Sequence, residues 1–172
     1  MKQRNTTKWF FKWLLLAATF LGCVSLAYAQ PDLPPRSLTV IATQSIHFGT
    51  LCVGATGGTT TVSWDGSRSS TGDVVLLAIA PTAQPAIFEV TLCQGRNVII
   101  TFSPTTTLTN GTGGSLTLNI GPTEQGGNNA SFTTNNDCNF ITPLRVGGTL
   151  VIPGSAPSGT YSGSFDITFN QE

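Results

Sequence analysis

The sequence predicts an all-β protein, folded as a two-layer antiparallel sandwich of seven to eight strands. Short runs in which apolar and polar residues alternate recur along the chain, and clusters of Gly, Pro and Asn separate them. Such alternation is typical of strands with one buried and one solvated face, and the clusters supply the backbone angles that turns require. No stretch keeps apolar residues at helical spacing for three turns.

The first 29 residues have the three regions of a secretory signal peptide. Four basic residues precede an apolar run over 13–26, and the small residues Ala27 and Ala29 follow it. The run is shorter than the roughly 20 residues needed to span a bilayer. We expect cleavage after Ala29, a proline-rich linker over 30–37 and one domain over 38–172. A lipoprotein remains an alternative, because the residues before Cys23 resemble the end of a lipobox.

Cleavage would leave 143 residues (172 − 29) with eight acidic residues, four arginines and no lysine, a net charge of −4. This balance argues against nucleic acid, which is bound largely through Lys and Arg, and against a basic patch for anionic lipid. We therefore expect an exported protein in the periplasm, at the cell surface or outside the cell. We expect no membrane span in the mature chain.

The clearest strand is the last one, where apolar and small residues share one face and polar residues the other over 161–169. The longest polar stretch, 121–139, is predicted to be a loop. Further strands are expected over 38–52, 58–64, 73–79, 86–92, 97–102, 115–120 and 144–152. The predicted core comprises Phe48, Phe88, Val90, Ile100, Phe102, Leu118, Leu150, Phe165 and Ile167.

Three cysteines remain after cleavage, and an oxidising compartment favours one disulfide with one thiol left over. If every turn reverses the chain, Cys93 and Cys138 lie at the same end of the sandwich and Cys52 lies at the opposite end. A disulfide needs Cα atoms within about 7 Å, so the strand count predicts a bond between Cys93 and Cys138.

The sequence contains no motif for catalysis or metal binding. His47 is the only histidine and alternates with apolar neighbours on a predicted strand, and a G-x-S-x-G turn is absent. Zinc requires four ligands at short spacings, which the chain lacks. Calcium is a weak alternative in the asparagine-rich stretch 128–139, where Asp137 is the single carboxylate. We therefore predict no catalytic residue, no cofactor and no metal.

Eight short motifs follow one another along the chain: Leu38–Val40, Ile46–Leu51, Gly57–Val62, Arg68–Val74, Phe88–Val90, Leu108–Gly111, Arg145–Leu150 and Gly159–Phe165. In their order and spacing over 38–169 they resemble a bacterial exported family catalogued as domain of unknown function 4402. The closing strand and the Phe48-Gly49 pair are also similar to spore-coat-U and pilin-like domains. This resemblance implies an immunoglobulin-like, pilin-like sandwich that serves as a surface or fimbrial building block.

We therefore expect a non-enzymatic structural subunit of a pilus-like or cell-surface assembly. Its partners would be copies of itself or other subunits, joined by β-strand pairing. The resemblance to pilin-like domains also implies a chaperone and an usher as partners. Leu38, Val40 and Ala42 alternate and form a candidate strand-exchange segment, although residues 37–46 can equally complete the molecule's own sheet. The alternative is a monomeric secreted module that binds carbohydrate or another surface. A secreted hydrolase is a third, weaker hypothesis.

Overall fold

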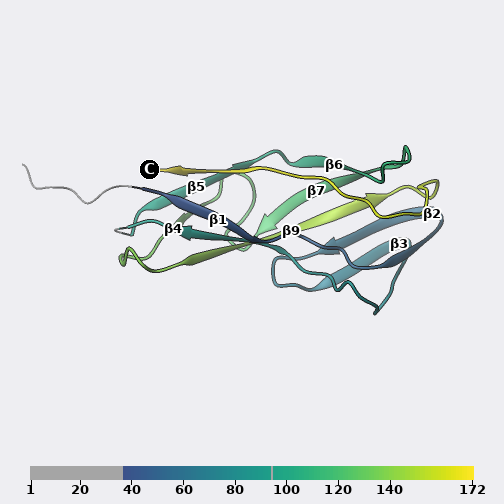
Figure 1. Ribbon diagram of the computed structural model, residues 1–172, viewed down its shortest axis with the longest axis horizontal. Helices are drawn as coiled ribbons and strands as arrows, with labels where there is room; N and C mark the ends of the chain where they lie inside the picture. The colour runs from purple at the N-terminus through teal and green to yellow at the C-terminus, as the bar shows by residue number, and fades with distance from the viewer. Residues whose placement is uncertain (1–36, 94) are drawn as a thin grey trace, which may run out of the picture. The chain divides into compact units, whose positions relative to one another are not determined.

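The computed structural model describes residues 37–93 and 95–172, and all regular structure in this part of the chain is β (Figure 1). The predicted signal peptide over 1–29 and all of the predicted linker except Ser37 lie outside the described residues. The strands are β1 (Thr39–Gln44), β2 (Leu51–Val62), β3 (Arg68–Leu76), β4 (Ala86–Thr91), β5 (Asn97–Phe102), β6 (Thr105–Thr109), β7 (Ser115–Thr123), β8 (Ser131–Thr133), β9 (Thr142–Ile152) and β10 (Ile167–Gln171).

The larger sheet is built around β9. Its first half pairs with β4 and its second half with β2, while β7 pairs along the other edge. The resulting order is β1-β4-β9-β2-β3, with β6 joined to β7. Every pairing in this sheet is antiparallel. The all-β, antiparallel fold class predicted from alternation is therefore confirmed.

The second sheet has the order β10-β5-β8. The chain continues from β5 through Pro104 into β6, which belongs to the larger sheet. The segment before β10 runs beside β6 in the opposite direction. Thr109 and Ser162 exchange two backbone hydrogen bonds of 2.9 Å, and Thr106 Oγ1 donates to the carbonyl of Ser164. The C-terminal segment thus runs first along β6 and then along β5, connecting the two layers (Figure 1).

A tyrosine fixes the start of this C-terminal segment. The hydroxyl of Tyr161 donates a 2.7 Å hydrogen bond to the carbonyl oxygen of Pro157, four residues upstream. A tyrosine that bonds to the backbone a few residues upstream is typical of one corner in immunoglobulin-like sandwiches. The contact orients the chain before it enters the sheet.

The hairpin of β2 and β3 folds back on itself. The pairing register shifts between Val53 and Gly58, and Gly57 and Gly72 have φ angles of 70° and 69°. Glycine adopts these left-handed angles without a steric penalty. A Cβ atom on Gly72 would lie 2.6 Å from the carbonyl oxygen of Gly57. The fold therefore needs glycine here, because the two backbones approach so closely.

Arg68 ties the two ends of the folded hairpin together. It begins β3, whereas Thr50 and Leu77 lie just beyond the opposite end of the β2–β3 pairing. Its guanidinium donates to the carbonyl oxygen of Thr50 at 2.8 Å and to that of Leu77 at 3.2 Å. Burial lowers the pKa of this side chain. These contacts are possible only because the hairpin bends.

The core lies between the two layers, and the predicted core residues divide into two groups. Six are buried: Phe48, Val90, Ile100, Phe102, Leu118 and Leu150. Phe88, Phe165 and Ile167 are only half-buried and pack against the core from its side, so the prediction that they are core residues is wrong. Phe88 lies on β4 and Ile167 on β10, but Phe165 precedes β10, so the strand predicted over 161–169 is wrong before Ile167.

Two strands lie where none was predicted. β6 has a single buried residue, Leu108, and β8 has a single one, Phe132. One inward residue makes no visible alternation, so seven or eight strands were predicted where the described residues form ten. The stretch 121–139 is accordingly not one loop, since it contains the end of β7, all of β8 and the buried Thr134.

Candidate functional site

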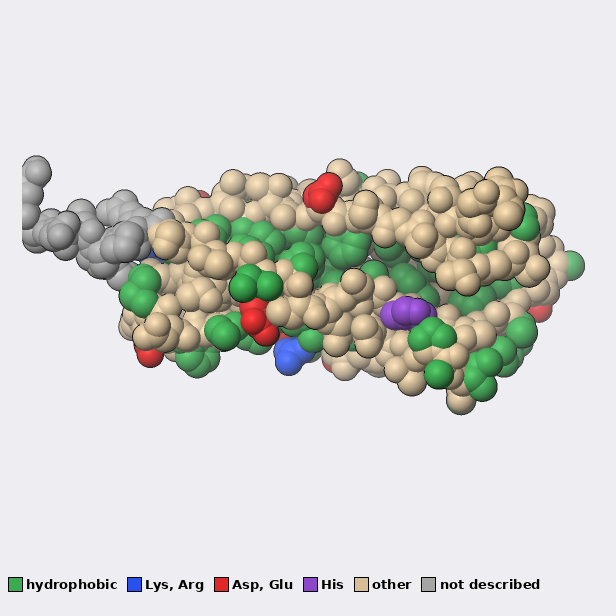
Figure 2. Space-filling model, in the orientation of Figure 1, with side chains coloured by type: hydrophobic (Ala, Val, Ile, Leu, Met, Phe, Trp, Pro, Cys, Tyr) green, Lys and Arg blue, Asp and Glu red, His purple; other side chains and the backbone are tan. Residues whose placement is uncertain are grey.

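A groove lies between β1 and the C-terminal segment. In Figure 2 hydrophobic side chains line a hollow between two ridges of largely polar surface. The elements beside it carry apolar residues that pack against the core yet remain partly exposed, namely Leu38 and Val40 of β1, Phe88 of β4, and Phe165, Ile167 and Phe169 of the C-terminal segment. They come from both sheets, so the groove is the open side of the sandwich.

Aromatic rings form the floor of the groove. The ring of Phe88, on β4, lies 6.4 Å from that of Phe165 in an edge-on arrangement. It also lies 5.8 Å from the ring of Phe169, at a tilted angle. These are the distances of favourable aromatic contacts. The rings therefore connect the two sheets where no backbone pairing joins them.

Both strands beside the groove are edge strands. β1 pairs only with β4, and β10 pairs only with β5, among the described residues. Glu172 N donates to Asn97 O at 3.1 Å, and backbone groups of an antiparallel strand alternate between its two sides. The N–H and C=O groups of Ile167, Phe169 and Gln171 therefore point away from β5, toward the open edge.

The predicted strand-exchange segment lies in β1 and is paired within its own molecule. Val40 lies opposite Val90, and Ala42 lies opposite Phe88. Leu38 and Val40 are half-buried against the core, while Ala42 is exposed. In this structure β1 thus completes its own sheet and forms one wall of the groove.

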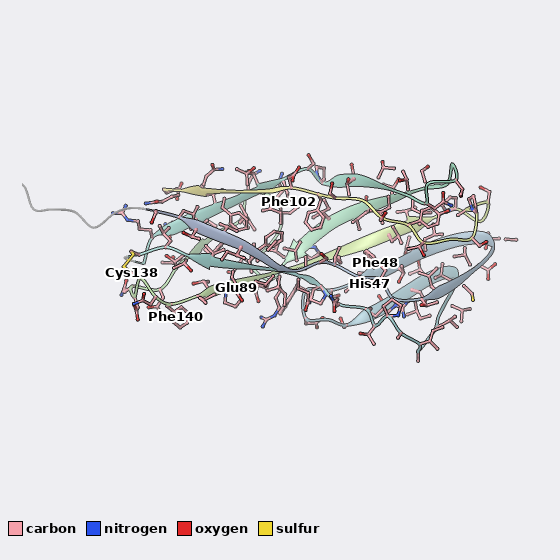
Figure 3. All side chains as sticks on the ribbon, viewed as in Figure 1. His47, Phe48, Glu89, Phe102, Cys138 and Phe140 are labelled. Atoms are coloured by element: carbon pink, nitrogen blue, oxygen red, sulfur yellow. A yellow bond between two sulfur atoms is a disulfide. The ribbon has the colours of Figure 1, made fainter. Side chains whose placement is uncertain are left out.

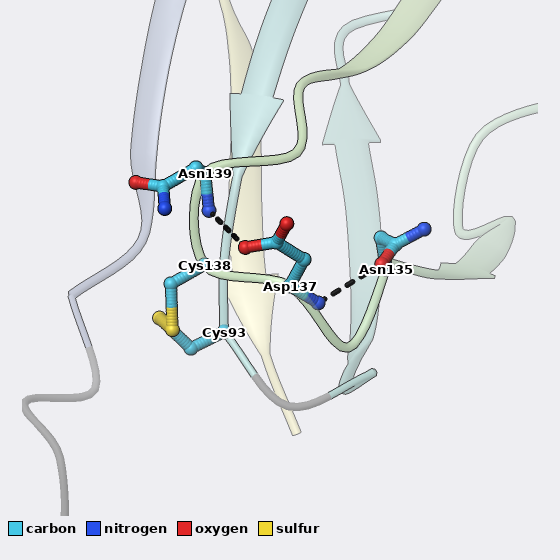
Figure 4. The surroundings of a disulfide bond; sticks show 5 residues. All are labelled: Cys93, Asn135, Asp137, Cys138 and Asn139. Atoms are coloured by element: carbon cyan, nitrogen blue, oxygen red, sulfur yellow. Dashed lines mark hydrogen bonds between the residues drawn. A yellow bond between two sulfur atoms is a disulfide. The ribbon is translucent and has the colours of Figure 1, made fainter.

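Cys93 and Cys138 form a disulfide with a Cα–Cα distance of 4.2 Å. Cys93 follows β4 and Cys138 precedes β9, and these strands are neighbours in the sheet (Figure 4). Cys52 is a free, exposed cysteine in β2. This is the pairing that the strand count predicts, and it closes the end of the sandwich where β10 also finishes (Figure 3).

The asparagine-rich stretch near the disulfide is organised by its own backbone. The side-chain oxygen of Asn135 accepts from the N–H of Asp137, and a carboxylate oxygen of Asp137 accepts from the N–H of Asn139, both at 2.9 Å (Figure 4). The oxygens considered for calcium thus serve to stabilise turns. Among the described residues no group of three or more His, Cys, Asp or Glu side chains is placed to hold a metal.

His47, the single histidine of the chain, has structural partners. His47 is exposed; its Nδ1 accepts from the N–H of Gly49 at 2.9 Å, and its backbone pairs with Gln84.

A surface depression of about 500 Å³ lies over β2, β7 and β9 and is lined by residues without ionisable groups, namely Thr56, Gly58, Thr59, Ser115, Thr117, Val151, Ile152 and Pro153. The described residues also include no helix that could cross a membrane.

The groove was not predicted from the sequence. Alternation correctly placed Ile167 and Phe169 on the inward face of the last strand, and Phe165 packs against the core from the segment before that strand. Whether another strand lies over that face depends on how the strands are distributed between the sheets. Only the order β1-β4 in one sheet and β10-β5 in the other shows that both edges beside these residues are open.

Comparison with known proteins gives one match. No curated protein and no solved structure matches the chain significantly. A family model described as "Domain of unknown function (DUF4402)" matches residues 38–170, from the residue before β1 to the penultimate residue of β10. The predicted family is therefore confirmed, and the chain belongs to the DUF4402 family.

Proposed function

We propose that this protein is a non-enzymatic, exported structural subunit of a pilus-like or cell-surface assembly that is held together by β-strand pairing. The observation that carries the proposal is the groove, in which half-buried apolar side chains lie between two free strand edges. An extended segment of another chain can add to such an edge, gaining main-chain hydrogen bonds and burying its alternate side chains.

Neither edge strand contains the lysine or proline that would protect it against such pairing. Soluble proteins commonly block edge strands with lysine, proline or bulges. β10 reads Ile-Thr-Phe-Asn-Gln and contains none of these. β1 has no charge or proline, and its one irregularity follows Ala42. Exposed edges of this kind favour aggregation, so their presence here supports a use in assembly.

Two further features support the proposal. The Cys93–Cys138 disulfide fits an oxidising compartment, in agreement with the predicted signal peptide and with a location in the periplasm, at the surface or outside the cell. The similarity of the closing strand to pilin-like domains adds copies of the chain, other subunits, a chaperone and an usher as proposed partners.

The test is immunogold electron microscopy of producing cells, with antibodies against the mature protein. Wild-type protein is expected in surface assemblies. Phe169→Pro removes an N–H that points to the open edge and is not used within the fold, so it should abolish incorporation. Phe169→Ala, the matched control, also removes the ring but keeps the N–H and should reduce incorporation less. Wild-type protein found only as a free monomer, with both variants indistinguishable from it, would refute the proposal.

A further inference from the structure

Resting on the proposed function, we infer that the groove binds an extended segment of a different polypeptide, with apolar residues at alternate positions and basic residues between them, rather than a segment of a second copy. Three observations support the inference. They are the two-residue spacing of the apolar residues along the groove, the carboxylates beside it, and the poor fit of this chain's own segments.

The two-residue spacing of the apolar residues along the groove fits a partner segment in an extended conformation. Phe165, Ile167 and Phe169 are spaced two residues apart and face inward, while Asp166 and Thr168 are exposed. Side chains of an added strand alternate in the same way. The outward N–H and C=O groups of β10 also require a partner backbone that is extended and able to form ladder hydrogen bonds. Only the apolar half of that partner's side chains would enter the groove.

The charges beside the groove favour a basic partner. Residues 37–44 and 161–172, which form its two walls, contain no Lys or Arg. They contain Asp166 and Glu172, both exposed. Lysine or arginine on the outward face of the bound segment would complement these carboxylates.

The chain's own segments fit the groove poorly. The segment 30–37 contains Pro31, Pro34 and Pro35, which cannot donate ladder hydrogen bonds. β1 is already paired with β4 and carries no basic residue. These sequences therefore lack either the donors or the charge that the groove requires.

Direct pairing between the β10 edges of two copies is also unfavourable in the register that pairs the two strands over their full length. An antiparallel pair centred on Phe169 would place Asp166 of each copy opposite Glu172 of the other, because both residues lie three positions from the centre. Like charges directly opposite each other destabilise a strand pair. The symmetric dimer is therefore opposed by two carboxylate pairs.

The experiment measures peptide binding to the purified mature protein by calorimetry at low and high salt. The probe is a synthetic ten-residue peptide in which valine alternates with lysine. One control peptide has glutamate in place of lysine, and another has the same five valines and five lysines in two blocks. The alternating lysine peptide should bind at least about tenfold more tightly than either control, and salt should weaken its binding.

Substitutions in the protein test where the peptide binds and whether Asp166 contributes to its affinity. Asp166→Asn should weaken binding of the lysine peptide by about twofold to fivefold, as expected for an exposed ion pair. Asp73→Asn, which changes an exposed carboxylate on β3, should leave binding unchanged. Phe169→Pro should abolish binding, with its circular dichroism spectrum and thermal transition used to verify that it remains folded.

The outcomes separate this inference from the proposed function. Purified protein that forms dimers or filaments by itself, sensitive to Phe169→Pro, would show that a second copy fills the groove; the inference would be wrong and the subunit role would stand. Equal binding of the lysine and glutamate peptides would refute the basic partner. A monomer that binds none of the peptides would overturn the inference, leaving the microscopy of surface assemblies to decide the proposed function.

Discussion

Phe88 and Phe165 meet edge to face across the open side of the sandwich, with ring centroids 6.4 Å apart. One ring belongs to β4 of the larger sheet and the other to the segment that leads into β10. Because both rings are half-buried, their contact holds the sheets together while leaving apolar surface open to solvent. This combination has a measurable consequence for stability.

Phe165→Ala should destabilise the protein by about 1.5–2.5 kcal/mol, roughly half the 3–5 kcal/mol expected for a buried phenylalanine. The ring is partly exposed, so less transfer free energy is lost and water can enter the space. Phe102→Ala is the matched control, since Phe102 is only 8% exposed, and it should cost about 3–5 kcal/mol. Urea denaturation measures both. Equal losses would mean that the groove is closed in solution.

The disulfide should contribute about 4 kcal/mol to stability, as the chain-entropy model gives for a loop of 45 residues. Cys93→Ser with Cys138→Ser removes it and should lower the free energy of unfolding by about this amount. Cys52→Ser, the control, alters an exposed free thiol and should have no such effect. A non-reducing peptide map that joins Cys52 to either partner would contradict the assignment.

Arg68→Met should destabilise the folded hairpin by about 1.5–3 kcal/mol, the range for hydrogen bonds that involve a charged group. The carbonyl of Leu77 loses its donor, whereas that of Thr50 still accepts from the N–H of Leu77 at 3.0 Å. Arg68→Lys should recover part of the loss, because one ammonium cannot reach both carbonyls as the planar guanidinium does. Amide hydrogen exchange should show faster opening at Leu77. Unchanged exchange there would argue against the folded hairpin.

The turn between β2 and β3 should weaken in acid. Hydrogen bonds from Ser67 hold the pKa of Asp65 below its ordinary value of 3.8. Since the folded pKa is the lower one, the stabilisation is present above the unfolded value and is lost as pH falls through the folded value. The protection of the Ser67 amide, measured as its exchange rate relative to the intrinsic rate at the same pH, should therefore fall below about pH 4. Asp65→Asn should remove this pH dependence, and an acid-insensitive wild type would contradict the prediction.

Local pattern was enough to predict the all-β class, most of the strands and the disulfide. Alternation follows from the two-residue period of a strand, which is a property of the chain itself. The pairing of Cys93 with Cys138 needed only strand directions, and these follow from counting reversals along the sequence. The short strands β6 and β8 were missed because each has only one buried residue, Leu108 and Phe132, and one residue forms no pattern.

The groove was decided by the tertiary structure alone. The sequence shows that Phe165, Ile167 and Phe169 face inward, but a strand's inward face can be covered or open without any change in its own residues. Coverage depends on which strands end as sheet edges, and here β1 and β10 are edge strands of different sheets. Edge positions result from long-range pairing around β9 and β5, between residues far apart in the chain. For that reason alternation predicted a core where the folded chain leaves an apolar groove.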